Sequence, residues 1–356
     1  MGKVLIEKLL YTCPDVKEII LLVRPKRGKT AAQRVEDFAK IAAFGRIMRE
    51  KPEVMKKIYP IFGDITKPDF ELSPEHLKRL IERTEIVFHM AASLKLEATL
   101  KPNILANLTA TKNVLEVAKR ITNLIQFVYT STAYCCEDQE VLEEKVYDFP
   151  HVPEDLIRCA EWMSEEAMAG AQKAILGTQP NTYTYTKRLA EILVRDHYET
   201  LPICIVRPSI VSPAFADPIP GWVDSLNGPP GILLAASKGV LRSMLVNGEN
   251  KIEAIPVDAC ISGMVFLVKH LVTNVRAAEI PVYNMTLHES RKITMNKMLE
   301  YARDLRQKYP SYGGLWYPDG DITQNVYLHT FKIIFFQWIP AYIIDFFLLC
   351  FGQKRL

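Results

Sequence analysis

The chain has 356 residues, of which 49% are hydrophobic and 24% are charged, so it is long enough for one large or two ordinary globular domains. Its net charge of only +3 excludes a strongly basic nucleic-acid-binding protein. The seven cysteines include no Cys-x-x-Cys pair and no Cys/His cluster at zinc spacing, which predicts reduced thiols in a cytosol-facing protein rather than a disulfide framework or a zinc site.

The predicted elements alternate between helices and strands. A helix is predicted at 4–10, where apolar residues have helical spacing, and Ser73-Pro-Glu predicts a helix start with proline at the first position. Further helices are predicted at 107–119 and around Tyr183. Short, mostly apolar runs predict strands at 18–24, 57–64, 86–92, 124–130 and 202–207. This alternation predicts an α/β protein with a doubly wound parallel sheet, in which ligands bind at the carboxyl ends of the strands.

The first predicted helix lies closer to the start of the chain than the first helix of a dinucleotide-binding fold does. Such a fold opens with a strand and a glycine-rich loop, and only Met1 and Gly2 can belong to that loop here. Because the first strand is central in this fold, its absence would leave groups of the sheet ladder unpaired. Either the sequence is a fragment or its N-terminal part is built in an unusual way, and we favour the fragment.

The motif Tyr183-Thr-Tyr-Thr-Lys187 places a phenol and an ammonium four residues apart, on one face of a helix. A neighbouring cation favours the phenolate, so we expect Tyr183 to be easier to ionise and to donate a proton to a carbonyl oxygen. A hydroxyl from Thr132 or Ser131 can hold the same oxygen. Two exposed polar residues at the start of an amphipathic helix would give the same short motif.

The segment 331–351 is strongly apolar and aromatic, and the basic residues Lys354 and Arg355 follow it. Lys332, Gln337, Pro340 and Asp345 interrupt it, whereas a membrane-spanning helix has few or no charges. We expect a membrane-associated or re-entrant hairpin broken at Pro340, or a tilted span. The alternative is a buried helix pair that packs on a further C-terminal domain.

Several motifs, taken in order, resemble the fatty acyl-CoA reductases, a male-sterility-type branch of the extended short-chain dehydrogenase/reductases. Gly2-Lys-Val-Leu-Ile-Glu-Lys-Leu-Leu10 resembles the first helix of that family, and its usual lead-in would place Gly2 as the last glycine of the loop. The other matching motifs are Leu21 to Arg34, Gly63-Asp64, Phe88-His-Met-Ala-Ala92, Ser131-Thr-Ala-Tyr134, Tyr183-Thr-Tyr-Thr-Lys187, Arg207-Pro-Ser-Ile-Val211, Pro220-Gly221-Trp222 and Ile255-Pro-Val-Asp258.

The resemblance implies a Rossmann-like fold of the extended type without its first strand. It implies an NADP-binding reductase domain at 1–275 with a substrate-side insert at 135–180, a further substrate-side part at 276–330 and an apolar, membrane-associated segment at 331–356 that begins a truncated C-terminal domain. The implied catalytic residues are Tyr183, Lys187 and Thr132, with Ser131 as the fallback hydroxyl. The implied cofactor-binding residues are Gly2, Arg24, Arg34, Asp64, Ala91, Ala92, Lys187, Pro208 and Ser209.

Two of these positions, and His89 in one of the matching motifs, can also be interpreted from their residue types. Arg24 ends the second strand of the fold, where an acidic residue would bind the ribose hydroxyl of NAD, and an arginine suits the 2′-phosphate of NADPH. Asp64 either bonds the adenine or caps the turn after its strand. His89 is expected to be a packed strand histidine, since no partner at metal-ligand spacing is visible.

The implied activity is NADPH-dependent reduction of long-chain fatty acyl-CoA to fatty alcohol through the aldehyde, with release of coenzyme A. The residues 232–236 and 240–241 would line an acyl channel or form ordinary core. The resemblance also implies a membrane-associated protein of the endoplasmic reticulum or peroxisome, with its catalytic part facing the cytosol and no nucleic-acid partner. The alternatives are an extended reductase of a sugar nucleotide or steroid, and a non-catalytic or fragmentary protein with the reductase fold.

Overall fold

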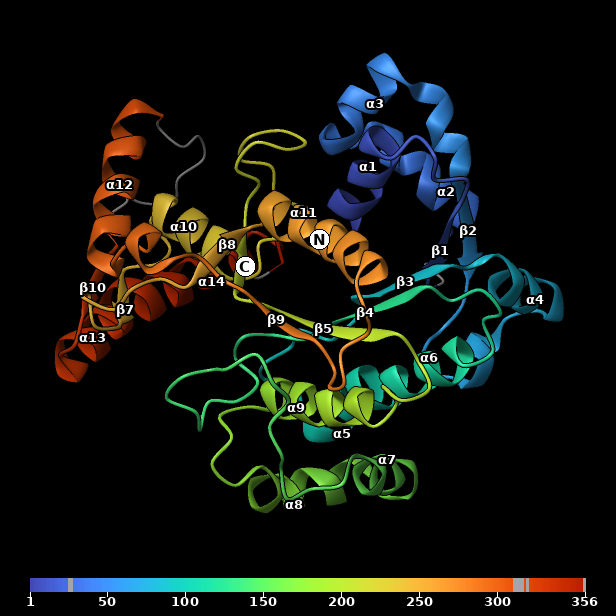
Figure 1. Cartoon of the computed structure of the whole chain (residues 1–356). Helices are drawn as coiled ribbons and strands as arrows, with labels where there is room; N and C mark the ends of the chain where they lie inside the picture. Colours follow the sequence, from blue (N-terminus) through green and yellow to red (C-terminus); the bar gives the residue numbers. More distant parts are fainter. Residues whose placement is uncertain (25–27, 310–316, 318–319, 355–356) are drawn as a thin grey trace. The chain divides into compact units, whose positions relative to one another are not determined.

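The computed structural model describes residues 1–24, 28–309, 317 and 320–354 (Figure 1). The chain divides into two compact units, the first formed by residues 1–222 and 255–286 and the second by residues 223–254 and 287–356. Residues 25–27 of the loop that carries the predicted phosphate-binding arginines, and Arg355 of the basic tail, lie outside the described residues.

The strands of the first unit are β1 (Ile19–Val23), β2 (Ile58–Phe62), β3 (Ile86–His89), β4 (Gln126–Thr130), β5 (Ile203–Pro208), β6 (Ile210–Ser212) and β9 (Val282–Met285), and β8 (Ala254–Pro256) begins one residue before its second segment. Its helices are α1 (Gly2–Thr12), α2 (Ala31–Glu36), α3 (Gly45–Glu50), α4 (Pro74–Arg83), α5 (Leu100–Asn103), α6 (Ala110–Ala118), α7 (Pro153–Trp162), α8 (Glu165–Leu176), α9 (Thr182–Arg195) and α11 (Val257–Thr273). The second unit contains β7 (Ser243–Leu245), β10 (Asp321–Thr323), α10 (Pro229–Ser237), α12 (Met295–Lys308), α13 (Val326–Ile333) and α14 (Ile339–Cys350).

The main sheet of the first unit has the strand order β3-β4-β5-β9, and all its neighbouring strands are parallel. A second parallel pair joins β1 to β2. β1 and β3, the two strands that would flank the central first strand of a dinucleotide fold, belong to different sheets in the described part of the chain. The strand predicted at 86–92 ends at His89, so Ala91 and Ala92 lie in the loop that follows it.

Both faces of the main sheet are covered by helices, because side chains alternate along each strand. Phe127 and Tyr129 of β4 belong to the buried cluster formed with α6, α7 and α9, whereas Val128 belongs to the cluster formed with α1 and α11. Figure 1 shows the two helical layers on opposite sides of the sheet. The prediction of an α/β, doubly wound parallel sheet is therefore confirmed.

The insert predicted at 135–180 is irregular up to residue 152 and then forms α7 and α8. Ser164 begins α8 by accepting a hydrogen bond from the backbone N–H of Ala167 at 3.1 Å. α7 packs against α9, so the insert covers the outer side of the helix that carries Tyr183.

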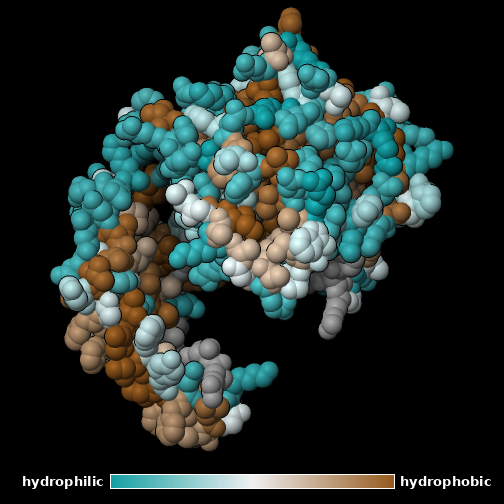
Figure 2. Space-filling model, turned by 90° about the horizontal axis from the view of Figure 1, so that it is seen from below, coloured by the Kyte–Doolittle hydropathy of each residue, from teal (hydrophilic) through white to brown (hydrophobic). Residues whose placement is uncertain are grey.

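The C-terminal segment is one continuous helix from Val326 to Cys350, long and apolar enough to cross a membrane by length and composition. The prediction of a hairpin broken at Pro340 is wrong. A π-helical turn at 334–338 precedes the proline, and its wider hydrogen-bond spacing accommodates a residue that lacks an N–H and clashes with the preceding turn. No part of the helix is buried, and its hydrophobic side chains are seen on the face shown in Figure 2. The segment is one helix rather than the pair of the alternative prediction, and its packing on a further C-terminal domain stays a prediction.

Candidate active site

The N-terminal turn of α9 is fixed by the residue before it. The side chain of Asn181 accepts a hydrogen bond from the backbone N–H of Thr184 at 2.9 Å, so the helix begins at Thr182. Tyr183, Lys187 and Glu191 then follow at intervals of four and lie on one face of the helix. This face meets β4 and the loop that follows β4.

Tyr183 is half-buried and shares a hydrogen bond with the hydroxyl of Thr132. Thr132 in turn accepts a hydrogen bond from the backbone N–H of Tyr134 at 3.3 Å. Burial raises the pKa of Tyr183 to about 12, although the bond to Thr132 acts in the opposite direction. The expectation that Lys187 makes this phenol easier to ionise is therefore wrong for the free protein, because the loss of hydration has the larger effect.

Lys187 points at the end of β4 and is only 3% exposed. Its Nζ donates hydrogen bonds to the carbonyl oxygen of Thr130 at 2.7 Å and to the hydroxyl of Tyr129 at 3.4 Å. The ammonium also lies 4.9 Å from the centre of the Tyr129 ring. Burial lowers the pKa of Lys187 to about 8, although the charge of Glu191 and the thiol of Cys135 oppose the shift.

The lowered pKa of Lys187 predicts a pH-dependent stability difference between the wild type and a Lys187→Met variant. Between pH 8 and the ordinary lysine pKa of 10.5, the unfolded chain binds a proton that the folded protein does not, so rising pH favours folding. We expect the free energy of unfolding of the wild type, relative to the variant, to rise by roughly 3 kcal/mol across this window. Urea unfolding of both proteins at several pH values measures it, and a difference independent of pH would contradict the assignment.

Three buried hydroxyls lie at the carboxyl ends of β4 and β5 without a hydrogen-bond partner among the described residues: those of Thr130, Ser131 and Ser209. Their backbones are held in place, since Ser131 N–H donates to Val206 O at 2.7 Å and Ser209 N–H donates to Met285 O at 3.0 Å. An unpartnered buried hydroxyl is costly unless a ligand satisfies it. These hydroxyls fit the nicotinamide end of a dinucleotide, which carries both amide and ribose groups.

The backbone also connects the two strand ends that carry these hydroxyls. The N–H of Ala133 donates to the carbonyl oxygen of Pro208 at 2.9 Å. Thr132, Pro208 and Ser209 are thereby brought to one edge of the sheet, beside Lys187. The structure places them where the carboxyl ends of parallel strands meet, which is where such sheets bind ligands.

The arginines predicted to bind a phosphate are also close to each other. Arg24 follows β1 and is exposed, and Nη1 of Arg34, from α2, donates to the backbone carbonyl oxygen of Arg24 at 2.5 Å. α2 begins with a capping box in which Thr30 and Gln33 bond each other's backbone N–H groups. This start of the helix fixes the direction in which Arg34 leaves the backbone.

The remaining predicted cofactor contacts lie at helix and strand ends. Gly2 is the first residue of α1, and a Cβ there would meet no atom within 4 Å. Ala91 is exposed and Ala92 half-buried in the loop after β3. Oδ1 of Asp64 accepts hydrogen bonds from the N–H and the hydroxyl of Thr66, both at 2.9 Å, so Asp64 caps the turn after β2.

His89 is a packed histidine, as predicted. It is 5% exposed, and its Nε2 lies 3.0 Å from the hydroxyl of Thr111. Burial, with a smaller contribution from the charge of Lys187, lowers the pKa of His89 to about 3, so the ring is neutral at physiological pH.

Sequence reasoning missed Asn107. It lies in the π-helical turn Ile104–Thr109, and its side chain bonds Ser93 N–H at 2.7 Å and Thr186 Oγ1 at 3.0 Å. It therefore ties the loop that contains Ala91 and Ala92 to the helix of Tyr183. An asparagine inside an apolar helix run was the available signal, since a buried amide needs partners.

Sequence reasoning also missed a buried ion pair behind Lys187. Arg207 of β5 donates to both oxygens of Glu191, with Nε–Oε1 at 2.8 Å and Nη2–Oε2 at 2.6 Å. Their side chains are 0% and 1% exposed. The pair fixes the carboxylate one helical turn from Lys187, where it helps to keep the ammonium charged.

The second unit contains an apolar cavity of about 430 Å³. Its wall comes mainly from α10, α12 and the start of β10, and its volume lies in the range of small-molecule sites. The residues that line it are Ile232, Leu233, Leu234, Ala236, Ser237, Leu241, Met244, Met295, Met298, Leu299, Ala302, Arg303, Leu305, Arg306, Tyr309, Gly320, Asp321 and Ile322.

Solved structures are similar to this chain in fold. The reductase domain of a nonribosomal peptide synthetase from Mycobacterium tuberculosis matches with a TM-score of 0.64 and 15% identity, covering 93% of this chain and 72% of that one. The terminal reductase domain of the myxalamid pathway matches with a TM-score of 0.60 and 21% identity, covering 85% of this chain and 66% of that one. At these identities the likeness shows the fold, a Rossmann-like fold of the extended short-chain dehydrogenase/reductase type.

Sequence comparison is more specific. A family model described as "Male sterility protein" matches residues 1–264. The chain is 35% identical over 354 residues to fatty acyl-CoA reductase 1 of Gallus gallus and 34% identical over 355 residues to fatty acyl-CoA reductase 2 of Mus musculus. Each alignment covers 99% of this chain and 68% of the relative. With the parallel sheet and the Tyr183, Thr132 and Lys187 cluster at its edge, these matches lead to one conclusion: the chain belongs to the fatty acyl-CoA reductase family.

Proposed function

We propose that the protein reduces long-chain fatty acyl-CoA to the fatty alcohol through the aldehyde, with NADPH as the reductant and release of coenzyme A. The observation that carries the proposal is the Tyr183–Thr132 hydroxyl pair beside the buried Lys187, in a chain of this family. NADPH supplies the hydride when it is bound.

The residues of this chain provide the acid half of the reaction. The hydroxyls of Tyr183 and Thr132 lie within hydrogen-bond distance of each other, and the thioester carbonyl oxygen would sit beside them, where negative charge develops as the carbonyl is reduced. Tyr183 donates its proton to that oxygen. A phenol whose pKa is about 12 is fully protonated at physiological pH and is ready to act as the acid.

The other residues hold and orient the reactants. Lys187 is assigned to the nicotinamide ribose, and Ser131, Pro208 and Ser209 to the nicotinamide end. Gly2, Ala91 and Ala92 would lie along the backbone of the cofactor. Arg24 and Arg34 are assigned to the 2′-phosphate, since a guanidinium can bind phosphate through two parallel hydrogen bonds. Asp64, which caps a turn, would contact the adenine through its remaining acceptor capacity.

The apolar cavity of the second unit is proposed to hold part of the acyl chain. Substituting Ala302→Trp would fill part of this cavity. We expect KM for palmitoyl-CoA to rise about ten-fold or more, since several methylene groups would lose their burial at about 0.8 kcal/mol each. A short-chain acyl-CoA should be affected much less. Steady-state kinetics with a chain-length series measures this, and equal losses for all chain lengths would place the acyl chain elsewhere.

The continuous apolar helix is proposed to attach the protein to a membrane, at the endoplasmic reticulum or peroxisome, with the catalytic unit facing the cytosol. Exposed aromatic side chains line it, among them Phe335, Phe336 and Trp338. The ammonium of Lys332 lies 3.3 Å from Asp321, so this charge of the helix is paired.

The activity is tested directly with the purified protein in lipid or detergent. We expect consumption of NADPH that depends on palmitoyl-CoA, with release of one free thiol of coenzyme A per aldehyde formed. The substitution Arg24→Ala should weaken the binding of NADPH far more than the binding of NADH. Turnover only with a sugar nucleotide or steroid would favour another extended reductase, and NADPH binding without turnover would favour a non-catalytic protein.

A further inference from the structure

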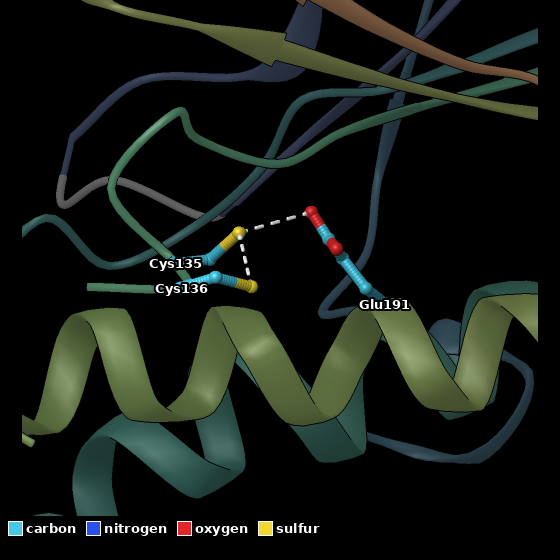
Figure 3. A group of neighbouring side chains, drawn as sticks. All are labelled: Cys135, Cys136 and Glu191. Carbon is cyan, nitrogen blue, oxygen red and sulfur yellow. Dashed lines mark hydrogen bonds between the residues drawn. The ribbon is translucent and has the colours of Figure 1, made fainter. Parts of the chain in front are cut away.

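Two adjacent cysteines lie in the loop after β4, beside the catalytic candidates. Cys135 is fully buried and Cys136 is 5% exposed, and their sulfur atoms are 3.7 Å apart. Figure 3 shows both thiols above α9, with Cys135 and Glu191 pointing toward one another. The loop backbone here is irregular, so it is not held by a sheet ladder.

The loop is fixed to α9 at three points. Thr132 bonds Tyr183, the thiol of Cys135 donates to Oε1 of Glu191 at 3.2 Å, and Asp138 accepts from Nη1 of Arg188 at 2.6 Å. The two cysteines occupy the middle of this stretch. Any change in their covalent state therefore acts on the loop that carries Thr132.

The two thiols have different environments. The hydrogen bond between the two thiols, helped by the charges of Arg188 and Arg207, lowers the pKa of Cys136. The same contact, together with burial and the charge of Glu191, raises the pKa of Cys135 well above its ordinary value. Cys136, which also keeps some exposure, is thus the thiol that reacts first, since the thiolate is the nucleophile.

We propose that Cys135 and Cys136 form a vicinal dithiol that hydrogen peroxide closes to a disulfide, and that this closure reversibly stops catalysis at the neighbouring Tyr183. The part of the inference that concerns catalysis rests on the proposed function. The part that concerns the disulfide does not.

The chemistry is balanced with peroxide as the only oxidant. The Cys136 thiolate attacks one oxygen of hydrogen peroxide, the O–O bond breaks, and the departing hydroxide takes a proton to leave as water. The sulfur of Cys135 then attacks the sulfenic sulfur of Cys136, the S–O bond breaks, and a second water leaves. The carboxylate of Glu191, already bonded to the Cys135 thiol, is placed to take its proton. In total, two thiols lose two electrons and two protons to one peroxide.

The geometry favours a bond that is easily reduced. A disulfide needs sulfur atoms about 2.05 Å apart, so the two sulfurs must approach each other. The Cα atoms of adjacent residues are only about 3.8 Å apart, below the usual separation of about 4.4 Å or more across a disulfide. Strained disulfides of this kind have more oxidising potentials, which is the property of reversible rather than structural bonds.

A metal ion suits this cluster less well. Cys135, Cys136 and Glu191 place their ligand atoms close together. Both carboxylate oxygens of Glu191 already accept hydrogen bonds from the Arg207 guanidinium, at 2.8 and 2.6 Å. A cation bound there would lie against a buried positive charge, which is unfavourable. Disulfide closure needs no additional cation.

The closure would disturb the catalytic candidates in two ways. Cys135 would lose the proton that it donates to Glu191, the residue that helps to keep Lys187 charged. The approach of the two sulfurs would also move a loop that begins three residues upstream at Thr132. The Tyr183–Thr132 hydroxyl pair would then lose its alignment, and a displacement of about 1 Å is enough to cost a large part of the rate.

The test treats the purified protein with hydrogen peroxide and then with dithiothreitol. Mass spectrometry of the peptide that contains both cysteines should show the loss of two hydrogens, reversed by dithiothreitol. The thiols titrated after denaturation should fall by two from the seven of the reduced chain. Acyl-CoA reduction should slow at least ten-fold in parallel and return on reduction.

Cys136→Ser is expected to keep its basal activity and to resist peroxide, with Cys136→Ala as a second variant if the serine form folds poorly. Cys159→Ser, which removes a half-buried thiol on α7, is the matched control and should remain sensitive. An unchanged mass of the Cys135–Cys136 peptide, cadmium binding that protects both thiols without any disulfide, or peroxide inactivation of Cys136→Ser would each overturn the inference. The mass and thiol readouts stand even for a chain without acyl-CoA reductase activity, so the two proposals can fail separately.

Discussion

Replacing Tyr183 with phenylalanine is expected to lower kcat/KM for palmitoyl-CoA by roughly two to four orders of magnitude, the usual contribution of a positioned general acid. The change removes one hydroxyl from the Tyr183–Thr132 pair and leaves the ring in place. Thr132 and the cofactor-binding residues remain, so binding of NADPH should be nearly unchanged. Steady-state kinetics and an NADPH titration by fluorescence measure the two effects separately.

The helix itself offers a matched control. Tyr185 lies two residues further along, is fully buried, and its hydroxyl bonds Nδ1 of the half-buried His151 at 2.7 Å. Tyr185→Phe removes the same atom from the same helix and should cost about 1 kcal/mol of stability without a large loss of turnover. Near-normal reduction by the Tyr183→Phe variant, or equal losses in both variants, would rule out Tyr183 as the acid.

The substitution Arg207→Met is expected to lower the free energy of unfolding by roughly 3–5 kcal/mol, because it leaves the buried carboxylate of Glu191 without its ion-pair partner. Among the described residues, Glu191 would keep only the weak thiol donor of Cys135. Arg207 also donates to the carbonyl oxygens of Glu143 and Lys145 at 2.9 and 2.7 Å, which would lose a partner as well. Urea unfolding monitored by circular dichroism measures the change.

The double variant Arg207→Met with Glu191→Leu separates the effect of the buried charge on stability from the effect of packing. Because no unpaired carboxylate remains, much of the lost stability should return. Arg158→Met breaks an exposed ion pair with Asp155 and is the control, with little expected change. A double variant as unstable as Arg207→Met would show that the loss comes from packing and from the two carbonyl groups, not from the buried charge.

The order of the elements was predictable because each strand is a short apolar run bounded by turn residues. The strand at Gln126–Thr130 was predicted at 124–130 and the helix after Ser73 at its proline. The edges of the elements were less predictable. Ala91 and Ala92 have the apolar character of the strand before them but lie beyond its last ladder bond. In the same way, the π-helical turn before Pro340 depends on hydrogen-bond spacing, which residue types alone do not specify.

The motifs were enough to identify the residues of the candidate site, but they did not predict the pKa shifts of those residues. Spacing places Tyr183 and Lys187 on one helix face, yet it carries no information on burial. The bond from Lys187 to the carbonyl oxygen of Thr130 and the loss of hydration at Tyr183 decide the two pKa shifts, and both arise from contacts between distant parts of the chain. The pairing of Glu191 with Arg207 was hidden for the same reason, since sixteen residues separate them in sequence.

The high pKa of Tyr183 makes reduction of a carbonyl easier to observe at this site than oxidation of an alcohol. With a pKa of about 12, the phenolate makes up only about one part in 10⁵ of the free protein at pH 7. Oxidation of an alcohol needs that phenolate as a base, whereas reduction starts from the abundant neutral form. Under the proposed function, oxidation of the alcohol should therefore become measurable only in alkaline solution. The neutral phenol of Tyr183 in the free protein is the form that reduction of an aldehyde or thioester requires.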